Sequence, residues 1–274
     1  MTEKVLSHLL RWAGSKRTLL PKLVPYWPTN AKRYIEPFAG SAALFFAIRP
    51  KTAVLNDINR ELIETYQTVR CRSQQVAAAI SLLPPGKRSY LRLRKTDPAN
   101  LSAVSRAARF IFLNRYCFNG LYRTNHSGQF NVPYAPTKTG ALPDAKRLSR
   151  VASSLRRATL YSCDFESLLQ SEAREGDFVY LDPPFAVANR RVFRQYGPNV
   201  FGAEDLERLA AILDVLDRRK VRFVVSYAYC REALNALSGW EHRKVLTHRN
   251  IAGFAEHRRR AAELIVSNFV PTAT

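Results

Sequence analysis

Two short apolar segments, separated by a tight turn and a helical pattern, most constrain the fold of this chain. Residues 34–38 and 52–57 have the composition of buried strands, and the second segment ends on the carboxylate of Asp57. Residues 39–41 predict a tight turn, and residues 42–48 predict the start of a helix. This order of strand, turn, helix, strand and acid is typical of a nucleotide-binding α/β half.

The same rhythm returns in the second half of the chain. The residue pattern predicts one helix at 204–219 and four strands, at 159–162, 177–181, 222–226 and 261–269. We therefore expect an α/β fold with a Rossmann-like core, in which a mostly parallel sheet carries helices on both faces. With 274 residues, 46% of them apolar, the chain can form such a core and carry a smaller inserted domain.

The middle of the chain has a different character. Residues 60–151 show helical periods and loops with little strand signal, and basic side chains crowd into residues 87–95. A helix is predicted at 105–117, and a hairpin at 122–133 with its turn at residues 127–128. We interpret 60–151 as an inserted helical and hairpin domain, which divides the core domain into residues 1–59 and 152–274.

The charge balance favours a polyanionic partner. The chain has 43 Lys and Arg against 22 Asp and Glu, a formal net charge of +21. Each phosphate that a basic side chain neutralises releases condensed counterions, which favours binding to nucleic acid. A surface charged for solubility, or one that binds a membrane surface, is the alternative explanation.

Other sequence features argue against a membrane, secreted or metal-binding protein. No apolar run approaches the length needed to span a membrane, and the first residues lack a signal-peptide pattern. The four cysteines lie tens of residues apart, which predicts neither a zinc site nor a disulfide framework. We expect a cytoplasmic protein with no membrane partner and no metal.

The segment Asp182-Pro183-Pro184-Phe185, at the end of a predicted strand, carries the sharpest chemical signal. Ligands of open α/β sheets bind at the carboxyl ends of the strands, and two prolines hold the backbone there rigidly. A carboxylate and a backbone carbonyl that accept both hydrogens of an aryl amine would direct its lone pair toward a methyl donor. The Phe185 ring would stack on the base. The alternative is an Asp that caps a helix before a rigid turn.

The loop after the first predicted strand indicates a nucleoside site. Phe38 and Gly40 follow that strand, and glycine lets a backbone approach a ligand closely. Asp57 ends the next strand about 20 residues on, where an acid can accept a ribose hydroxyl. Because the chain lacks a GxGxxG motif, a nucleoside ligand is favoured over a dinucleotide. Tight packing would explain the glycine equally well.

Two further segments mix aromatic and cationic side chains. Near the start of the chain, Trp12 and Lys16 are predicted to close over the cofactor, with Lys16 facing its carboxylate. Residues 114–125 interleave Arg, Asn and aromatic residues, which can read base edges or fill a gap in the base stack. An exposed cationic helix entry and a solvated loop over a small core are the respective alternatives.

Taken together, these segments resemble the Dam-like family of DNA adenine-N6 methyltransferases. The matching stretches occur in the family's order and cover most of the chain, to residue 269: Trp12–Lys16, Glu36–Gly40, Asn56–Asn59, Asn114–Arg123, Phe130–Pro133 and Asp182–Phe185. Each motif is weak alone, but the combination is specific.

The resemblance implies a core that binds S-adenosylmethionine, with the insert recognising the target in double-stranded DNA. It also implies a protein that is nucleoid-associated in a bacterium or encoded by a phage. It implies that Trp12, Lys16, Asp57 and Asp182 bind the cofactor or border its site. The stretch from Asp182 to Phe185 would hold an adenine flipped out of the duplex.

The resemblance also implies DNA contacts. Phe118, Asn119 and Arg123 match a DNA-contacting loop of the family, in which Arg123 corresponds to an arginine that reads a base. We add Asn125 from the same loop. Arg258 and Arg259 lie in a stretch that resembles a basic family segment, and we expect them to meet phosphates.

The chain departs from the family pattern at three places. Phe185 replaces the usual tyrosine, Ser15 follows Gly14 in place of a second glycine, and Ser41-Ala42 replaces a loop that often carries another glycine.

We expect GATC, the family's best-known target, as the recognised sequence. Three questions stay open at this point. The substrate could be another planar amine, such as RNA adenine or cytosine N4. The chain could be a basic DNA-binding protein without catalytic activity, and a restriction endonuclease could act separately beside it.

Overall fold

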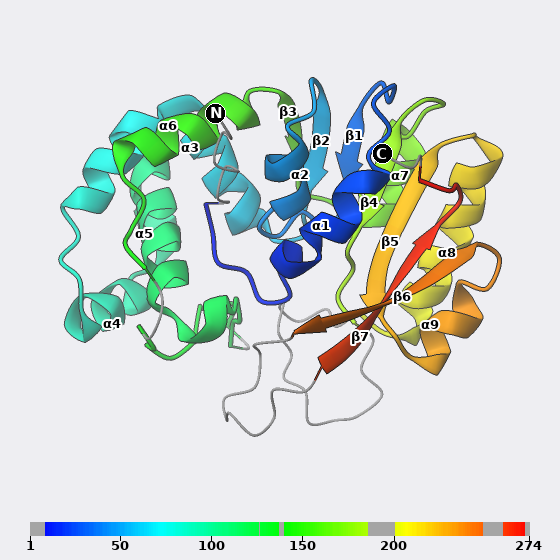
Figure 1. Cartoon of the computed structure of the whole chain (residues 1–274). Helices are drawn as coiled ribbons and strands as arrows, with labels where there is room; N and C mark the ends of the chain where they lie inside the picture. Colours follow the sequence, from blue (N-terminus) through cyan, green and yellow to red (C-terminus); the bar gives the residue numbers. More distant parts are fainter. Residues whose placement is uncertain (1–8, 126, 137–139, 186–200, 249–259, 272–274) are drawn as a thin grey trace.

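The computed structural model describes residues 9–125, 127–136, 140–185, 201–248 and 260–271. Within these residues, seven strands form one sheet of order β3-β2-β1-β4-β5-β7-β6 (Figure 1). The strands are β1 Tyr34–Glu36, β2 Ala53–Asn56, β3 Ala158–Tyr161, β4 Phe178–Leu181, β5 Arg222–Ala228, β6 Glu241–His248 and β7 Arg260–Ser267.

Strands β1 to β5 run parallel, whereas β7 is antiparallel to both β5 and β6. The order of the parallel strands is that of a Rossmann-like fold, so the predicted fold class is confirmed. Each predicted strand is present with bounds shifted by a few residues. Strand β6 was not predicted, because its side chains at 241–246 are exposed except Val245 and give little apolar signal.

Side chains of the parallel strands alternate between two apolar layers. Tyr34 and Tyr180 belong to a layer that α1 Leu20–Leu23, α2 Ala43–Ile48 and part of the insert cover. Ile35 and Val179 point to the opposite layer, under α7 Phe165–Glu172, α8 Ala203–Arg218 and α9 Arg231–Ala236. Both faces of the sheet are therefore covered by helices, as expected for buried parallel strands.

The predicted insert, residues 60–151, contains α3 Arg60–Ser81, α4 Lys87–Lys95, α5 Ala103–Tyr116 and most of α6 Ala145–Leu155, and these helices gather beside the sheet (Figure 1). The insert as a separate domain stays a prediction. Apolar side chains of α3, α5 and α6 belong to the same core layer as β1. A smaller cluster lies wholly within the insert: Tyr90, Phe112, Leu113, Cys117, Phe130 and Val132. The predicted hairpin is reduced to an isolated antiparallel bridge between Thr124 and Phe130.

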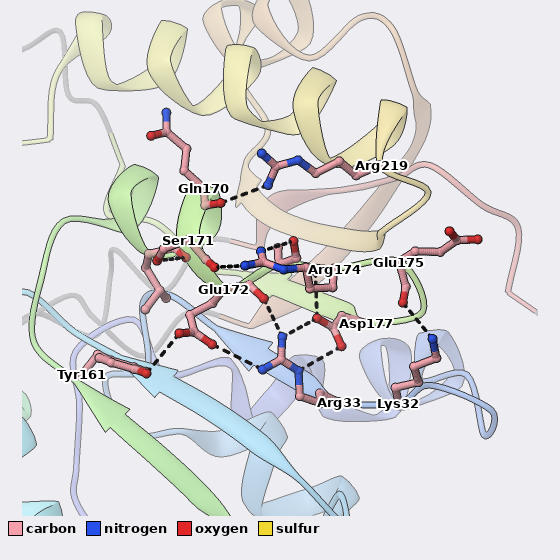
Figure 2. Close-up of polar contacts among 12 residues, drawn as sticks. Lys32, Arg33, Tyr161, Gln170, Ser171, Glu172, Arg174, Glu175, Asp177 and Arg219 are labelled. Atoms are coloured by element: carbon pink, nitrogen blue, oxygen red, sulfur yellow. Dashed lines mark hydrogen bonds and ion pairs between the residues drawn. The ribbon is translucent and has the colours of Figure 1, made fainter.

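An ion-pair network lies at the amino ends of β1 and β4 and extends to the side chain of Tyr161, the last residue of β3 (Figure 2). Arg33, just before β1, donates through Nη2 to Asp177 Oδ2 at 2.7 Å and through Nε to Oδ1 at 3.1 Å. Its Nη1 lies 3.3 Å from Glu172 Oε2 on α7, and Tyr161 of β3 donates to Glu172 Oε1. The hydrogen bond to Asp177 raises the pKa of Arg33. The network joins β1, β3, β4 and α7.

No helix of the described residues has both the length and the apolar character to cross a membrane.

Candidate active site at the carboxyl edge of the sheet

The predicted site residues converge where the strand order reverses. Strands β1 and β4 are neighbours, and the chain proceeds from them in opposite directions across the sheet. Such a switch point opens a crevice at the carboxyl ends of the strands. Gly40 follows β1, Asp57 follows β2 and Asp182 follows β4, so the topology brings all three to one edge.

Asp182 is held by two donors that share one of its oxygens. Lys16 Nζ lies 2.5 Å from Asp182 Oδ1, and Ser226 Oγ donates to the same oxygen at 3.0 Å. The Asp182 side chain is 18% exposed, and that of Lys16 is 7% exposed. Burial raises the pKa of Asp182, while attraction to the Lys16 ammonium opposes that shift. Within the described residues, both of these donors bind Oδ1 and none binds the other oxygen, Oδ2.

Lys16 lies in an acidic and aromatic environment. Its Nζ is 3.9 Å from Glu263 Oε2 on β7 and 5.0 Å from the centroid of the Phe185 ring. The structure thus places Lys16 between Asp182 and Phe185, a contact with Asp182 that the sequence analysis did not predict. A contact of Lys16 with the carboxylate of a cofactor stays a prediction. The sequence analysis missed Glu263, although an acid within the apolar pattern of 261–269 could have signalled it.

Asp57 shapes the glycine loop. Its Oδ2 accepts the Gly40 N–H at 2.9 Å, and its Oδ1 accepts the Asn59 N–H at 2.9 Å. Burial raises the pKa of Asp57 to about 6, and the two backbone donors oppose that shift. Each carboxylate oxygen has a second lone pair, so Asp57 can hold the loop and still accept a ribose hydroxyl.

Gly40 allows close contact with Trp12. The backbone at Gly40 has φ +47°, and a Cβ there would lie 2.7 Å from Trp12 Cδ1. A residue with a side chain would therefore clash and adopt an unfavourable backbone conformation. Trp12 also stacks on Tyr122 of the insert, with ring centroids 6.2 Å apart and planes at 18°. The glycine loop, the N-terminal segment and the insert thus meet at Trp12.

Two of the three departures from the family pattern contact one another. Ser15 Oγ and Ser41 Oγ are hydrogen-bonded at 2.9 Å, which links the N-terminal segment to the glycine loop. Ala42 has φ +51°, a conformation that favours glycine. The loop therefore keeps a glycine-like backbone although alanine occupies this position.

Phe38 and Phe185, the aromatic residues of the two loops, both pack against the core layer that contains Ile35 and Val179. The Phe185 ring packs edge-to-face against Tyr227 of β5, with centroids 5.2 Å apart. Phe38 contacts Phe165 at 5.1 Å and Phe201 at 6.1 Å between ring centroids. Pro183 is buried, and Pro184 is half-buried.

The predicted DNA-contacting residues lie at the end of α5 and in the loop after it. Phe118 is 39% exposed, and Asn119 has φ +52°. Arg123 donates through Nε to Asn131 Oδ1 at 2.7 Å, which orients its guanidinium. Asn125 Oδ1 accepts two backbone N–H groups of the turn at 127–129, so this side chain shapes the turn. DNA contacts of these residues stay predictions, and Arg258 and Arg259 lie outside the described residues.

Asn114 and Arg115 do not belong to a base-reading surface. Both are buried, and the Asn114 amide forms two hydrogen bonds with the backbone of Arg11, at 2.9 and 2.6 Å. Arg115 Nη2 donates to the Leu9 carbonyl at 3.3 Å. Asn114 and Arg115 therefore connect the N-terminal segment to the insert. The interpretation of residues 114–125 as a segment that contacts DNA bases is wrong for these two residues. Asn and Arg beside aromatic residues are typical of a base-contacting segment, and the sequence alone does not show that these two side chains are buried.

The insert concentrates positive charge. Residues 60–151 contain sixteen Lys and Arg against four Asp and Glu. On α4, the exposed residues Arg88, Arg92 and Lys95 recur at spacings of four and three residues, so they share one helix face.

The carboxyl edge of the sheet, in contrast to the basic insert, is rich in acidic residues. Glu36, Asp57, Asp182 and Glu263 gather there. Burial raises the pKa of Glu36 and of Asp182, Asp182 and Asp57 add to the shift of Glu36, and Glu263 adds to the shift of Asp182. Ile58, beside Asp57, is 61% exposed and offers an apolar surface. A carboxylate for ribose, an apolar surface for a base and a surplus of acids fit a nucleoside that carries a positive charge. The described residues contain no group of three or more His, Cys, Asp or Glu that could hold a metal ion.

Comparisons with known proteins agree with this geometry. A family model described as D12 class N6 adenine-specific DNA methyltransferase matches residues 12–251. The chain is 34% identical to the type II methyltransferase M1.LlaDCHI of Lactococcus lactis subsp. cremoris, with 94% of each chain covered. It is 31% identical to the type II methyltransferase M.MjaIII of Methanocaldococcus jannaschii, covering 95% of this chain and 98% of that protein. It is 32% identical to the DNA adenine methylase of Escherichia coli K12, with 79% of each chain covered.

Proposed function

The chain belongs to the D12 class of N6 adenine-specific DNA methyltransferases, and we propose that it methylates an adenine flipped out of duplex DNA, with S-adenosylmethionine as donor. The observation that supports the proposal is the Asp182 carboxylate at the switch point: within the described residues, Lys16 and Ser226 both bind its Oδ1 and no donor binds its Oδ2. For the target sequence we propose GATC, from the family resemblance alone.

Catalysis at this site consists mainly of orienting an amine. S-adenosylmethionine supplies, when bound, a methyl group already activated by its sulfonium. Asp182 Oδ2 and the Pro183 carbonyl accept the two N6 hydrogens and direct the nitrogen lone pair toward the methyl donor. The Phe185 ring stacks on the flipped base. Asp182 then takes the proton that N6 loses, which its raised pKa favours.

The glycine loop and the N-terminal segment would hold the cofactor. Asp57 accepts ribose hydroxyls through its remaining lone pairs, and Gly40 lets the Trp12 ring pack directly against the loop that borders the ligand. Phe38 borders the same edge after β1. Lys16 offers a positive charge between the cofactor site and Asp182. The surplus of acids at this edge favours the sulfonium.

The insert would bring the target adenine to Asp182. Its positive charge attracts the duplex, and the loop at 118–125 contacts the recognised site. Flipping the adenine costs a few kcal/mol. Arg258 and Arg259 would add phosphate contacts.

The decisive experiment is incubation of the purified chain with S-adenosylmethionine and unmethylated genomic DNA, followed by sequencing that detects modified bases. We expect N6-methyladenine at one recurrent motif. A modification on cytosine N4, or on RNA in a parallel reaction, would replace the substrate in the proposal. Absence of both methylation and cofactor binding by calorimetry would instead indicate a DNA-binding protein without catalytic activity.

Arg123→Ala is expected to relax sequence choice at one base pair. Loss of a bidentate contact to a base should cost about 1–3 kcal/mol of discrimination at that position. Methylation rates on a set of duplexes, each with one substituted base pair, measure this effect. Asn131→Ala removes the acceptor that orients Arg123 and should weaken discrimination at the same base pair. Equal discrimination by the wild type and Arg123→Ala at every position would contradict the role.

The basic face of α4 is expected to contact phosphates. Replacing Arg88, Arg92 and Lys95 with alanine should reduce the slope of log K against log salt by about 0.9 for each phosphate that the variant no longer neutralises. Binding should weaken equally on cognate and non-cognate duplexes. The control is Arg219→Ala, because this exposed arginine follows α8 near the amino ends of the strands, beside the network of Figure 2. An unchanged slope in the α4 variant would contradict a role of this face in DNA binding.

A further inference from the structure

Ser226 lies beside Asp182 because of the register of two parallel strands. Leu181 of β4 pairs with Val225 of β5, so the next residues along the two strands are Asp182 and Ser226. Ser226 is fully buried, and its Oγ donates to Asp182 Oδ1 at 3.0 Å. Ser226 is the one polar side chain among the buried residues 223–227 of β5, and the steps of methyl transfer assigned to Asp182 do not by themselves require it.

The hydrogen bonds around Ser226 have a defined direction. An ionised carboxylate only accepts hydrogen bonds, so the Ser226 hydroxyl gives its proton to Asp182. The buried Tyr180 hydroxyl lies 2.9 Å from Ser226 Oγ and must then be the donor in that pair. Burial raises the pKa of Tyr180 well above its usual value, which keeps that proton in place. The result is a chain from Tyr180 through Ser226 to Asp182.

We propose that Ser226 is a positioning residue for methyl transfer, which holds Asp182 ionised and turned so that Oδ2 faces the adenine amine. This inference rests on the proposed function of Asp182. Lys16 attracts Asp182 from one side with a long, flexible side chain, whereas Ser226 has a short side chain on a central strand of the sheet. The serine therefore fixes the rotation of the carboxylate, and Tyr180 fixes the serine.

The charged groups around Asp182 predict how loss of Ser226 changes the pH profile. Lys16 from the N-terminal segment and the Ser226 hydroxyl from β5 lower the pKa of Asp182, while burial and Glu263 from β7 raise it. Glu36 from β1 and Tyr180 from β4 also lie close enough to interact with Asp182. Removing the Ser226 hydroxyl removes one stabilising contact of the carboxylate. The pKa of Asp182 must then rise, and the acidic limb of kcat must move to higher pH.

Ser226→Ala tests the proposal. We expect kcat to fall about 10-fold, since the variant lacks a hydrogen bond to a charged group. The acidic limb of the kcat profile should move up by about one pH unit. The KM for S-adenosylmethionine and the affinity for duplex DNA should stay near wild type. Ser226→Thr keeps a hydroxyl and should restore kcat and the pH profile toward wild type.

Two controls separate positioning from a general packing effect. Ser267→Ala removes another buried serine hydroxyl, on β7, which donates to the Phe269 carbonyl and does not contact Asp182. It should leave kcat and its pH profile unchanged. Tyr180→Phe should shift the profile in the same direction as Ser226→Ala, but less, because the serine can still donate.

The outcomes distinguish this proposal from the function on which it rests. A Ser226→Ala profile that superimposes on the wild type, while Asp182→Ala is inactive, would overturn the role of Ser226 and leave that of Asp182 intact. An active Asp182→Ala enzyme would overturn both. A shifted profile in Ser226→Ala with near-normal substrate binding supports the proposal.

Discussion

Asp182→Ala is expected to abolish methyl transfer while leaving DNA binding largely intact. The variant loses the acceptor that orients the amine and takes its proton, and removal of one such electrostatic interaction costs about 10²–10³-fold in kcat. The effect should be larger here because Asp182 has both roles. Single-turnover methylation of a duplex with saturating S-adenosylmethionine measures the effect. A mobility-shift titration of the same duplex measures binding.

The comparison with Asp182→Asn separates chemistry from stability. Alanine leaves the Lys16 ammonium buried without its closest partner, and an uncompensated buried charge destabilises a protein. Asparagine keeps the shape and an acceptor oxygen but cannot take a proton, so it should also be nearly inactive. Thermal unfolding shows whether each variant is folded at the assay temperature. Normal turnover by a folded Asp182→Ala enzyme would refute the proposed mechanism.

The sequence was sufficient to predict the core of the fold because buried parallel strands have a strong signature. Strands β1, β2 and β4 are short, apolar and followed by glycine or acid, so both their positions and their functional ends could be predicted. Strand β6 could not be predicted, because it lies at the sheet edge with an exposed surface. The core layer shared by α3, α5 and the sheet also depends on long-range packing that periodicity does not reveal.

The site residues that follow the strands could be predicted from the sequence, whereas the residues that contact and support them could not. Asp57 and Asp182 each follow a predicted strand, and the topology brings them together as expected. Ser226 and Glu263 were missed because their contribution depends on the pairing of β5 with β4 and β7. The contact of Ser15 with Ser41 joins two departures that the sequence presents as unrelated, 26 residues apart.

Arg33→Ala is expected to cause a large loss of stability, about 3 kcal/mol in the free energy of unfolding. The Asp177 side chain is 2% exposed, and removal of its partner leaves a buried carboxylate without its guanidinium. Such changes cost about 3–5 kcal/mol, and the lower end applies because Arg33 itself is 28% exposed. Urea unfolding with an unchanged m-value measures the effect.

Two control variants test whether the paired geometry of Arg33 is the cause. Arg33→Lys keeps the charge but cannot form the two parallel bonds to Asp177, so its loss of stability should be intermediate. Arg60→Ala breaks an exposed pair with Glu64, which should cost about 1 kcal/mol or less. Arg33 and Asp177 lie at the amino ends of β1 and β4, whereas Asp182 follows the carboxyl end of β4, so kcat per folded molecule should not change. Equal destabilisation by Arg33→Ala and Arg60→Ala would show that the network contributes little to stability. A lower kcat in folded Arg33→Ala would show that the network also affects the active site.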